Sequence, residues 1–286
     1  MKKIMMAMAA ASMLLACSNE PEEVVTVKTA EPSDTMRTVE IRFEFPQVVE
    51  MVPMTRGTLS EANMTDLWLF DYMGDELKQT IHQASTDDGF GSVAVKAETG
   101  EHRFCFVASR GTEATVTDGE IAWGKPSDTF WQNAILNVTP QTATAQAVEL
   151  QRVATRLRIS VTDEVPATLK KLRMTADTWY CGLNAKTGEP TTATERTTTI
   201  SVPASYIGTT GTLAASIFGL CSEDYTTDVT VYALGENDAT IASVSLDGVP
   251  MAMNKTTNYS GPLFTRQPTF ALTTADAWGE EVTMTW

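Results

Sequence analysis

The stretch Val39-Glu40-Ile41-Arg42-Phe43-Glu44-Phe45 alternates apolar and charged side chains with a period of two residues. Successive side chains of a β-strand point to opposite faces, so the apolar residues of this stretch would share one face. Those residues are Val39, Ile41, Phe43 and Phe45. We therefore predict a half-buried first strand whose apolar face covers a hydrophobic core.

Two later stretches extend this pattern. Residues 67–72 (Leu-Trp-Leu-Phe-Asp-Tyr) are apolar on both faces, which is typical of a central strand. The aromatic residues Trp68, Phe70 and Tyr72 are accordingly expected to lie in the core rather than on a binding surface. Residues 156–161 (Arg-Leu-Arg-Ile-Ser-Val) alternate again and begin a second set of strands.

Turn residues recur at short intervals along the chain, and no long stretch has the 3.6-residue apolar period of a helix. This predicts an all-β fold made of two β-sandwich domains in tandem, at residues 38–150 and 151–286. Within this scheme, Ser127 to Ala134 could form a short helical turn, and Thr191 to Thr199 an exposed polar hairpin or loop.

Charge and histidine content argue against several classes of function. The 286 residues include 21 Lys and Arg but 36 Asp and Glu, giving a net charge of −15. Nucleic-acid binding needs a basic surface, so we expect no nucleic-acid partner. The two histidines, His82 and His102, lack the spacing of metal ligands, and no acid–base constellation is recognisable. We therefore predict a protein that is not an enzyme and holds no metal or cofactor.

The N-terminus has the pattern of a bacterial lipoprotein signal. Basic Lys2 and Lys3 precede the apolar residues 4–16, a stretch too short to span a bilayer but long enough for a secretory signal. The stretch ends in Leu14-Leu15-Ala16-Cys17, a lipobox. We predict that residues 1–16 are a signal peptide and that Cys17 is acylated, since several acyl chains anchor more firmly than one.

Residues 17–37 are polar and acidic and read as a flexible tether. An acidic run directly after a lipidated cysteine also resembles the surface-export signal of Bacteroidetes lipoproteins. No other apolar run approaches membrane-spanning length. The expected location is therefore the surface of the outer membrane, to which the lipid would hold the body of the chain.

Three cysteines remain if Cys17 is acylated. One disulfide could form in an exported protein, and Cys181 with Cys221 is the favoured pair, although spacing alone does not settle the pairing. Cys105 lies within an apolar strand-like segment, where we expect a buried, unreactive thiol.

Several segments together resemble the Bacteroidetes fimbrial subunits, which comprise the fimbrillin family and its lipidated, anchor-type relatives. The resemblance covers about residues 38–286 and contains no catalytic motif. Its carriers are Met54-Thr55-Arg56-Gly57, Met64-Thr65-Asp66-Leu67-Trp68-Leu69-Phe70-Asp71, Leu150-Gln151-Arg152-Val153-Ala154-Thr155-Arg156-Leu157-Arg158-Ile159 and Asn254-Lys255-Thr256-Thr257-Asn258-Tyr259-Ser260-Gly261-Pro262-Leu263-Phe264.

This resemblance implies two transthyretin-like sandwiches that assemble with other fimbrial subunits by strand donation. In β-augmentation, a sheet that lacks a strand exposes unpaired backbone and an apolar groove, which a neighbour's strand fills. In stem-type relatives an Arg-specific protease opens the groove, and Arg56-Gly57 is the best match to such a site here. Cleavage at Arg37-Thr38 would leave the first strand in place. Anchor-type relatives keep both the lipid and the strand.

Three functions therefore stay open at this stage. The preferred one is a lipid-anchored anchor or accessory subunit of a fimbrium, and the first alternative is a stem fimbrillin cut after Arg56. The second alternative is a surface lipoprotein that binds host or bacterial glycans. Its sugar platform would be built from exposed aromatic residues near turns, namely Trp123, Trp131, Trp179-Tyr180 or Trp278.

Overall fold

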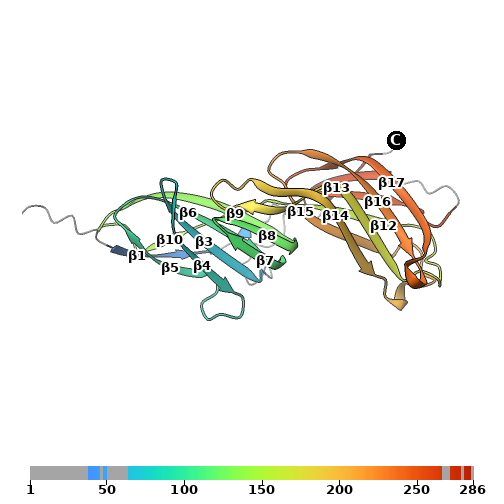
Figure 1. Cartoon of the computed structure of the whole chain (residues 1–286), viewed down its shortest axis with the longest axis horizontal. Helices are drawn as coiled ribbons and strands as arrows, with labels where there is room; N and C mark the ends of the chain where they lie inside the picture. The colour runs from blue at the N-terminus through green and yellow to red at the C-terminus, as the bar shows by residue number, and fades with distance from the viewer. Residues whose placement is uncertain (1–37, 46–47, 50–63, 266–270, 278–279, 285–286) are drawn as a thin grey trace, which may run out of the picture. The chain divides into compact units, whose positions relative to one another are not determined.

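The computed structural model describes residues 38–45, 48–49, 64–265, 271–277 and 280–284 (Figure 1). Regular structure in these ranges is β-strand, apart from two short 3-10 turns, η1 (Ala204–Tyr206) and η2 (Glu236–Asp238). The predicted all-β fold is therefore confirmed. Among the same residues, no helix is long and apolar enough to cross a membrane.

Two sheets form the N-terminal sandwich. The three-stranded sheet has the order β10 (Ala145–Ala147), β1 (Thr38–Glu44) and β5 (Ser92–Glu98). The six-stranded sheet has the order β2 (Val48–Val49), β11 (Leu150–Arg152), β9 (Thr129–Val138), β6 (Gly100–Ser109), β3 (Asp66–Met73) and β4 (Glu76–Ala84). Buried residues of both sheets share one core, which includes Phe43 of β1, Leu69 of β3 and Phe104 of β6.

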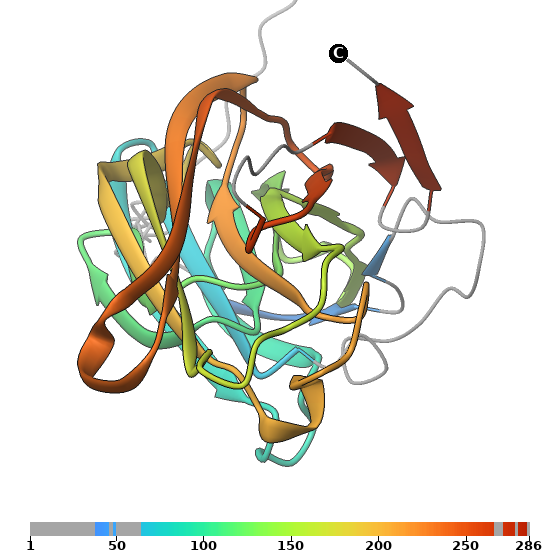
Figure 2. The same cartoon turned by 90° about the vertical axis from the view of Figure 1, so that its right-hand side faces the viewer.

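Two further sheets form the C-terminal sandwich. One has the order β15 (Ala214–Leu220), β12 (Ala154–Val161), β18 (Thr256–Gly261), β19 (Ala271–Ala277) and β20 (Glu280–Met284). The other has the order β17 (Thr240–Met251), β16 (Tyr225–Leu234), β13 (Lys171–Asn184), β8 (Glu120–Lys125) and β7 (Thr112–Thr117), and β14 (Pro190–Ser201) also pairs with β13. The β16–β17 hairpin is the long orange ribbon in Figure 2.

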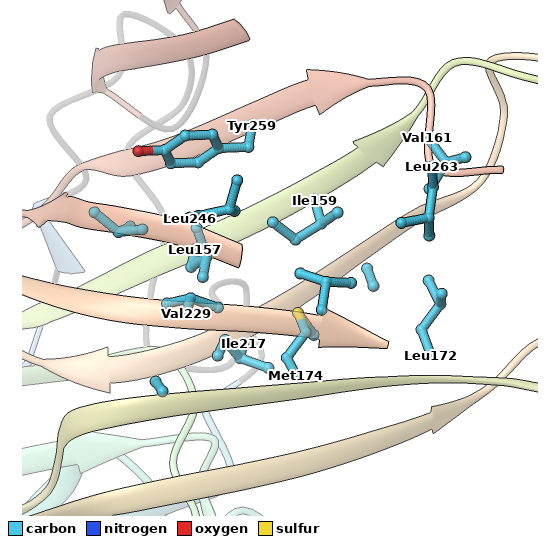
Figure 3. Close-up of a cluster of buried hydrophobic side chains, with 14 of the residues drawn as sticks. Leu157, Ile159, Val161, Leu172, Met174, Ile217, Val229, Leu246, Tyr259 and Leu263 are labelled. Atoms are coloured by element: carbon cyan, nitrogen blue, oxygen red, sulfur yellow. The ribbon is translucent and has the colours of Figure 1, made fainter. Parts of the chain in front are cut away.

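The core of the C-terminal sandwich follows from the alternation of its strands. Leu157 and Ile159 of β12 are fully buried, whereas the residues between and beside them are partly exposed. They face Met174 of β13 and Val229 of β16 across the sandwich (Figure 3). The alternating pattern predicted for residues 156–161 is thus confirmed.

The β7–β8 hairpin crosses the predicted domain boundary. Although it precedes residue 150, β8 pairs with β13 of the C-terminal sandwich, with Leu183 opposite Ile121. Ile121 and Trp123 also join a third buried cluster with Trp68 on the outer face of β3. All described residues fall in one unit, Met36–Trp286. The division into domains 38–150 and 151–286 therefore remains a prediction. The β7–β8 hairpin departs from it, because this hairpin lies before residue 150 but pairs with a strand after it.

The connection after the first sandwich contains a buried arginine. Arg152 Nε and Nη2 donate to Asp128 Oδ1 and Oδ2 at 2.7 and 3.0 Å, and Nη1 donates to Asn254 Oδ1 at 3.0 Å. Its guanidinium also lies 4.7 Å from the centre of the Phe130 ring. The bidentate pair with Asp128 fixes geometry as well as charge and joins β11 to the residue before β9. The bond to Asn254 joins β11 to the turn before β18.

Two local expectations have different outcomes. A helical turn at Ser127 to Ala134 is wrong, because residues from Thr129 onward form β9, which pairs antiparallel with β6 along its whole length. Thr191 to Thr199 belong to β14, which forms a hairpin with β13 and leaves many side chains exposed. The exposed hairpin is thus confirmed.

Candidate functional site

The first strand is the central strand of its sheet (Figure 1). On one side β1 pairs antiparallel with β5 through seven residue pairs, from Thr38 opposite Glu98 to Glu44 opposite Ser92. On the other side it pairs parallel with β10, with Arg42 opposite Ala145. Sequence reasoning predicted the strand but not its position between two neighbours.

Side chains of β1 and of the residue that follows it fill the core of the N-terminal sandwich. Ile41, Phe43 and Phe45 are at most 4% exposed, whereas Val39 is partly buried. The predicted shared apolar face is therefore confirmed. Each such side chain contributes about 1.5–3 kcal/mol when fully buried. Burial of this apolar face therefore supplies much of the free energy that holds β1 in the sandwich.

Aromatic rings join β1 to the opposite sheet. The Phe43 ring centre lies 4.8 Å from that of Phe104 and 4.9 Å from that of Phe106, both on β6. Phe45 meets Phe106 edge to face at 5.2 Å. Such pairs add about 0.5–1.5 kcal/mol beyond area burial, and their geometry favours one register of the strand.

Hydrogen bonds hold the C-terminal end of β1 on both sides. Arg42 N donates to Thr144 O at 2.8 Å, and Val148 N donates to Glu44 O at 3.0 Å. Toward β5, Ser92 Oγ donates to Glu44 Oε1 at 2.9 Å. Removal of β1 would leave these partners without their donors and acceptors, in addition to an open apolar groove.

The far edge of β5 is covered by side chains of the six-stranded sheet. Gln79 Nε2 donates to Lys96 O, Gln83 Nε2 donates to Ser92 O and His102 Nε2 donates to the carbonyl of Glu98, each at 3.0 Å. Free strand edges invite pairing with other chains, and proteins often block them with side chains. This edge is blocked in that way, whereas β1 lies in a position that only a strand can fill.

A buried ion pair lies at the end of the same core. His102 Nδ1 is 2.6 Å from Asp71 Oδ1, and both side chains are 1% exposed. Because Nε2 already donates a proton to Glu98 O, the short contact at Nδ1 requires a second proton, shared with the carboxylate. Sequence reasoning missed this pair, although an aspartate at position 71, inside a strand that is otherwise apolar on both faces, is a detectable signal.

The described cysteines are buried free thiols. Burial raises the pKa of Cys105 to about 12 and that of Cys221 to about 12, and it also raises the pKa of Cys181. Thiols of this kind are poor nucleophiles. The expected burial of Cys105 is confirmed, and its low reactivity stays a prediction.

The predicted Cys181–Cys221 disulfide is not formed in the structure. Both sulfurs lie close enough to Tyr225 to raise the pKa of its phenol, although burial contributes more. The pairing therefore remains a prediction for the exported protein.

The exposed tryptophan platform expected for glycan binding is not supported. Trp123 and Trp179 are at most 2% exposed, and Trp179 Nε1 donates to Phe218 O at 2.8 Å. Half-buried Trp131 donates from Nε1 to Ala185 O at 2.7 Å. The reason is that these rings pack between sheets, a tertiary effect that proximity to turns does not reveal. Trp278 lies outside the described residues.

Several other predicted site residues also lie outside the described part of the chain. These are Cys17, Arg56 and Gly57, together with the signal peptide and the tether. Lipidation and cleavage thus stay predictions. In the part that the structure describes, no group of three or more His, Cys, Asp or Glu side chains could hold a metal ion.

Comparison with known proteins gives a family and a fold. A model described as a family of unknown function (DUF6562) matches residues 115–285, more than half of the sequence, and the chain belongs to that family. None of the curated protein sequences matches it significantly.

Solved structures with the same fold come from Bacteroidetes. A candidate adhesin from Bacteroides ovatus has a TM-score of 0.54 at 10% identity, covering 88% of this chain and 98% of its own. A candidate polysaccharide-binding protein from Bacteroides thetaiotaomicron has a TM-score of 0.53 at 10% identity, covering 86% and 98%. The fimbrial anchor protein Mfa2 from Porphyromonas gingivalis has a TM-score of 0.50 at 10% identity, covering 86% and 99%. At these identities the likeness shows the fold, which agrees with the resemblance found in the sequence.

Proposed function

We propose that this chain is a lipid-anchored anchor or accessory subunit of a cell-surface fimbrium, and that it joins other subunits by β-strand donation. The role is structural rather than enzymatic. It is supported by the fold shared with Bacteroidetes adhesins and a fimbrial anchor protein, and by the lipobox ending in Cys17.

The position of β1 is the observation that carries the proposal. A strand at the edge of a sheet can leave without opening the core, but β1 lies between β5 and β10 and covers Phe104 and Phe106. Its loss would create a groove flanked by two unpaired strands. A foreign strand with the same alternating pattern would restore both ladders and the core contacts.

An uncut chain already fills that groove with its own β1. It can therefore end or hold a fibre, but it cannot accept a donor strand at this position. Cleavage after Arg56 would instead remove both β1 and β2, which precede that residue, along with the lipid. We assign the uncut form to this protein, because the body of the chain resembles the anchor-type relatives.

Mass spectrometry of the N-terminus of the protein taken from intact cells tests this assignment. We expect chains that begin at acylated Cys17, and we expect Cys17→Ala to release the protein from the outer-membrane fraction. Arg56→Ala should leave assembly unchanged, as should the matched variant Arg37→Ala. Fibres made mainly of chains that begin at Gly57, with polymerisation blocked by Arg56→Ala alone, would overturn the assignment in favour of a stem subunit.

A further inference from the structure

The three-stranded sheet ends at β5, so one edge of this strand points away from β1. Arg42 N donates to Thr144 O, on the side of β1 that faces β10. Opposite residues of an antiparallel pair exchange either both hydrogen bonds or none. Ala94, which lies opposite Arg42, therefore directs its N–H and C=O to the outer edge of β5, as does Lys96 two residues later.

This outer edge has the properties of a template for another strand. The seven residues of β5 pair with β1 in consecutive register, and their sequence (Ser-Val-Ala-Val-Lys-Ala-Glu) contains no proline. The exposed side chains beside the edge include Glu40, Arg42 and Lys96, so this face carries both signs of charge although the whole chain has a net charge of −15. Long, regular edges of this kind pair with other chains unless something covers them.

Side chains of β4, the edge strand of the six-stranded sheet, occupy the outer edge of β5. Gln83 Nε2 donates to Ser92 O at 3.0 Å, and Gly91 N donates to Gln83 Oε1 at 3.2 Å. This side-chain amide thus makes the two kinds of bond that a backbone peptide of a neighbouring strand would make. Further along β5, Gln79 Nε2 donates to Lys96 O at 3.0 Å.

A buried carboxylate orients the donors at the other end of β5. Asp71 Oδ2 accepts a hydrogen bond from Gln79 Nε2 at 3.0 Å, and Asp71 Oδ1 lies 2.6 Å from His102 Nδ1. The His102 side chain is 1% exposed, stacks on Phe104 with ring centres 5.4 Å apart and donates from Nε2 to Glu98 O. Both oxygens of one aspartate therefore orient side chains whose other bonds end on carbonyls of β5.

We propose that Gln79, Gln83 and His102 form an edge lock on β5, which prevents a second copy of this chain from pairing its own β5 there. The uncovered edge would fit that partner, because two identical antiparallel strands related by a two-fold axis present the same hydrogen-bonding edge to each other. The mixed charge beside the edge would let two acidic chains approach at this face. The edge lock is an autoinhibitory contact, and the inference does not depend on the fimbrial role.

The test compares variants of the full mature chain in detergent, with micelles in excess over protein. Gln79→Ala together with Gln83→Ala removes two of the three donors, and Gln79→Met with Gln83→Met does so while keeping the length of the side chains. Thr80→Ala with His82→Ala changes the opposite face of the same strand and is the matched control. Sedimentation equilibrium measures self-association, and hydrogen exchange read by mass spectrometry locates it.

We expect the dissociation constant of the self-complex to fall about tenfold or more in both glutamine double variants, because each copy then offers a partner strand two carbonyls that lack a side-chain donor. Residues 92–98 should exchange more slowly as the protein concentration rises. Adding Ala94→Pro removes an outward N–H without touching the ladder to β1, so it should restore the wild-type constant.

Self-association no tighter than that of the matched control would overturn the inference. Tighter association would also overturn it if the protected amides lie outside residues 92–98, or if the association persists with Ala94→Pro. A wild-type chain that already pairs through β5 at the same concentrations would show that the edge is not locked, and would overturn it as well.

Discussion

Phe43 of β1 and Phe104 of β6 meet ring to ring across the N-terminal sandwich, with their centres 4.8 Å apart and their planes tilted by 51°. This contact joins the first strand of the body to the middle of the opposite sheet. It makes β1 part of the core rather than an appendage. A subunit that lost β1 would therefore expose aromatic core surface, which is the driving force that strand donation needs.

Shortening Phe43 should weaken the whole N-terminal sandwich. Phe43→Ala is expected to lower the free energy of unfolding by about 3–5 kcal/mol, because it removes a fully buried ring and leaves a cavity. Urea denaturation followed by tryptophan fluorescence measures this. Arg42→Ala on the exposed face of the same strand should stay within about 0.5 kcal/mol of the wild type. Equal losses in the two variants would mean that β1 is not held by its apolar face.

Removal of the Asp71 carboxylate should be costly because it leaves His102 buried without its partner. Asp71→Ala is expected to destabilise the protein by about 3–5 kcal/mol, the usual loss for a broken buried pair. Asp66→Ala, which breaks the more exposed pair with His82 on the same strand, should cost at most about 1 kcal/mol. Thermal unfolding of both variants compares them directly. A smaller loss for Asp71→Ala than for Asp66→Ala would contradict the buried ion pair.

Alkaline pH should destabilise the fold. Burial raises the pKa of the Cys105 thiol from 9.0 to about 12 and that of the Tyr72 phenol from 10.0 to about 12, so the folded chain holds these protons more tightly than the unfolded chain. The associated stability is complete below about pH 9 and is lost as the pH rises toward about 12. The urea midpoint should therefore fall between about pH 8 and about pH 11, and less steeply in Cys105→Ala. A midpoint that stays constant over this interval would show that these groups titrate normally.

Local alternation predicted much of the fold and little of its long-range pairing. Residues 39–45 and 156–161 show a period of two because each strand has one buried face, and that signal lies within a few neighbouring residues. The β9 strand was missed because its middle residues are only partly buried, and its stability comes from pairing with β6. The pairing of β8 with β13 depends on contacts between residues far apart in sequence, which a local pattern cannot contain.

The sequence likewise predicted some features of the candidate site and not others. The apolar face of β1 could be read directly, because its register follows from alternation. Its place between β5 and β10 could not be predicted, because strand order depends on contacts among all the strands of the sheet and not on the sequence of one strand. The burial of Trp123 and Trp179 likewise arises where sheets and hairpins meet. Such contacts join residues that are far apart in the sequence, so neither composition nor residue spacing predicts them.

Disulfide trapping within assembled fimbriae tests the central claim, that this chain keeps its own β1 in the groove. Arg42 and Ala94 lie directly opposite each other in the β1–β5 register, and both side chains are exposed, so a cysteine pair there can bridge the two strands. Cells that express Arg42→Cys together with Ala94→Cys are oxidised, and the outer-membrane fraction is separated by mass without reductant. Each single variant is the control. We expect an internal bridge in a monomer-sized, acylated chain, whereas bridges that link β1 of one chain to β5 of another would contradict the account.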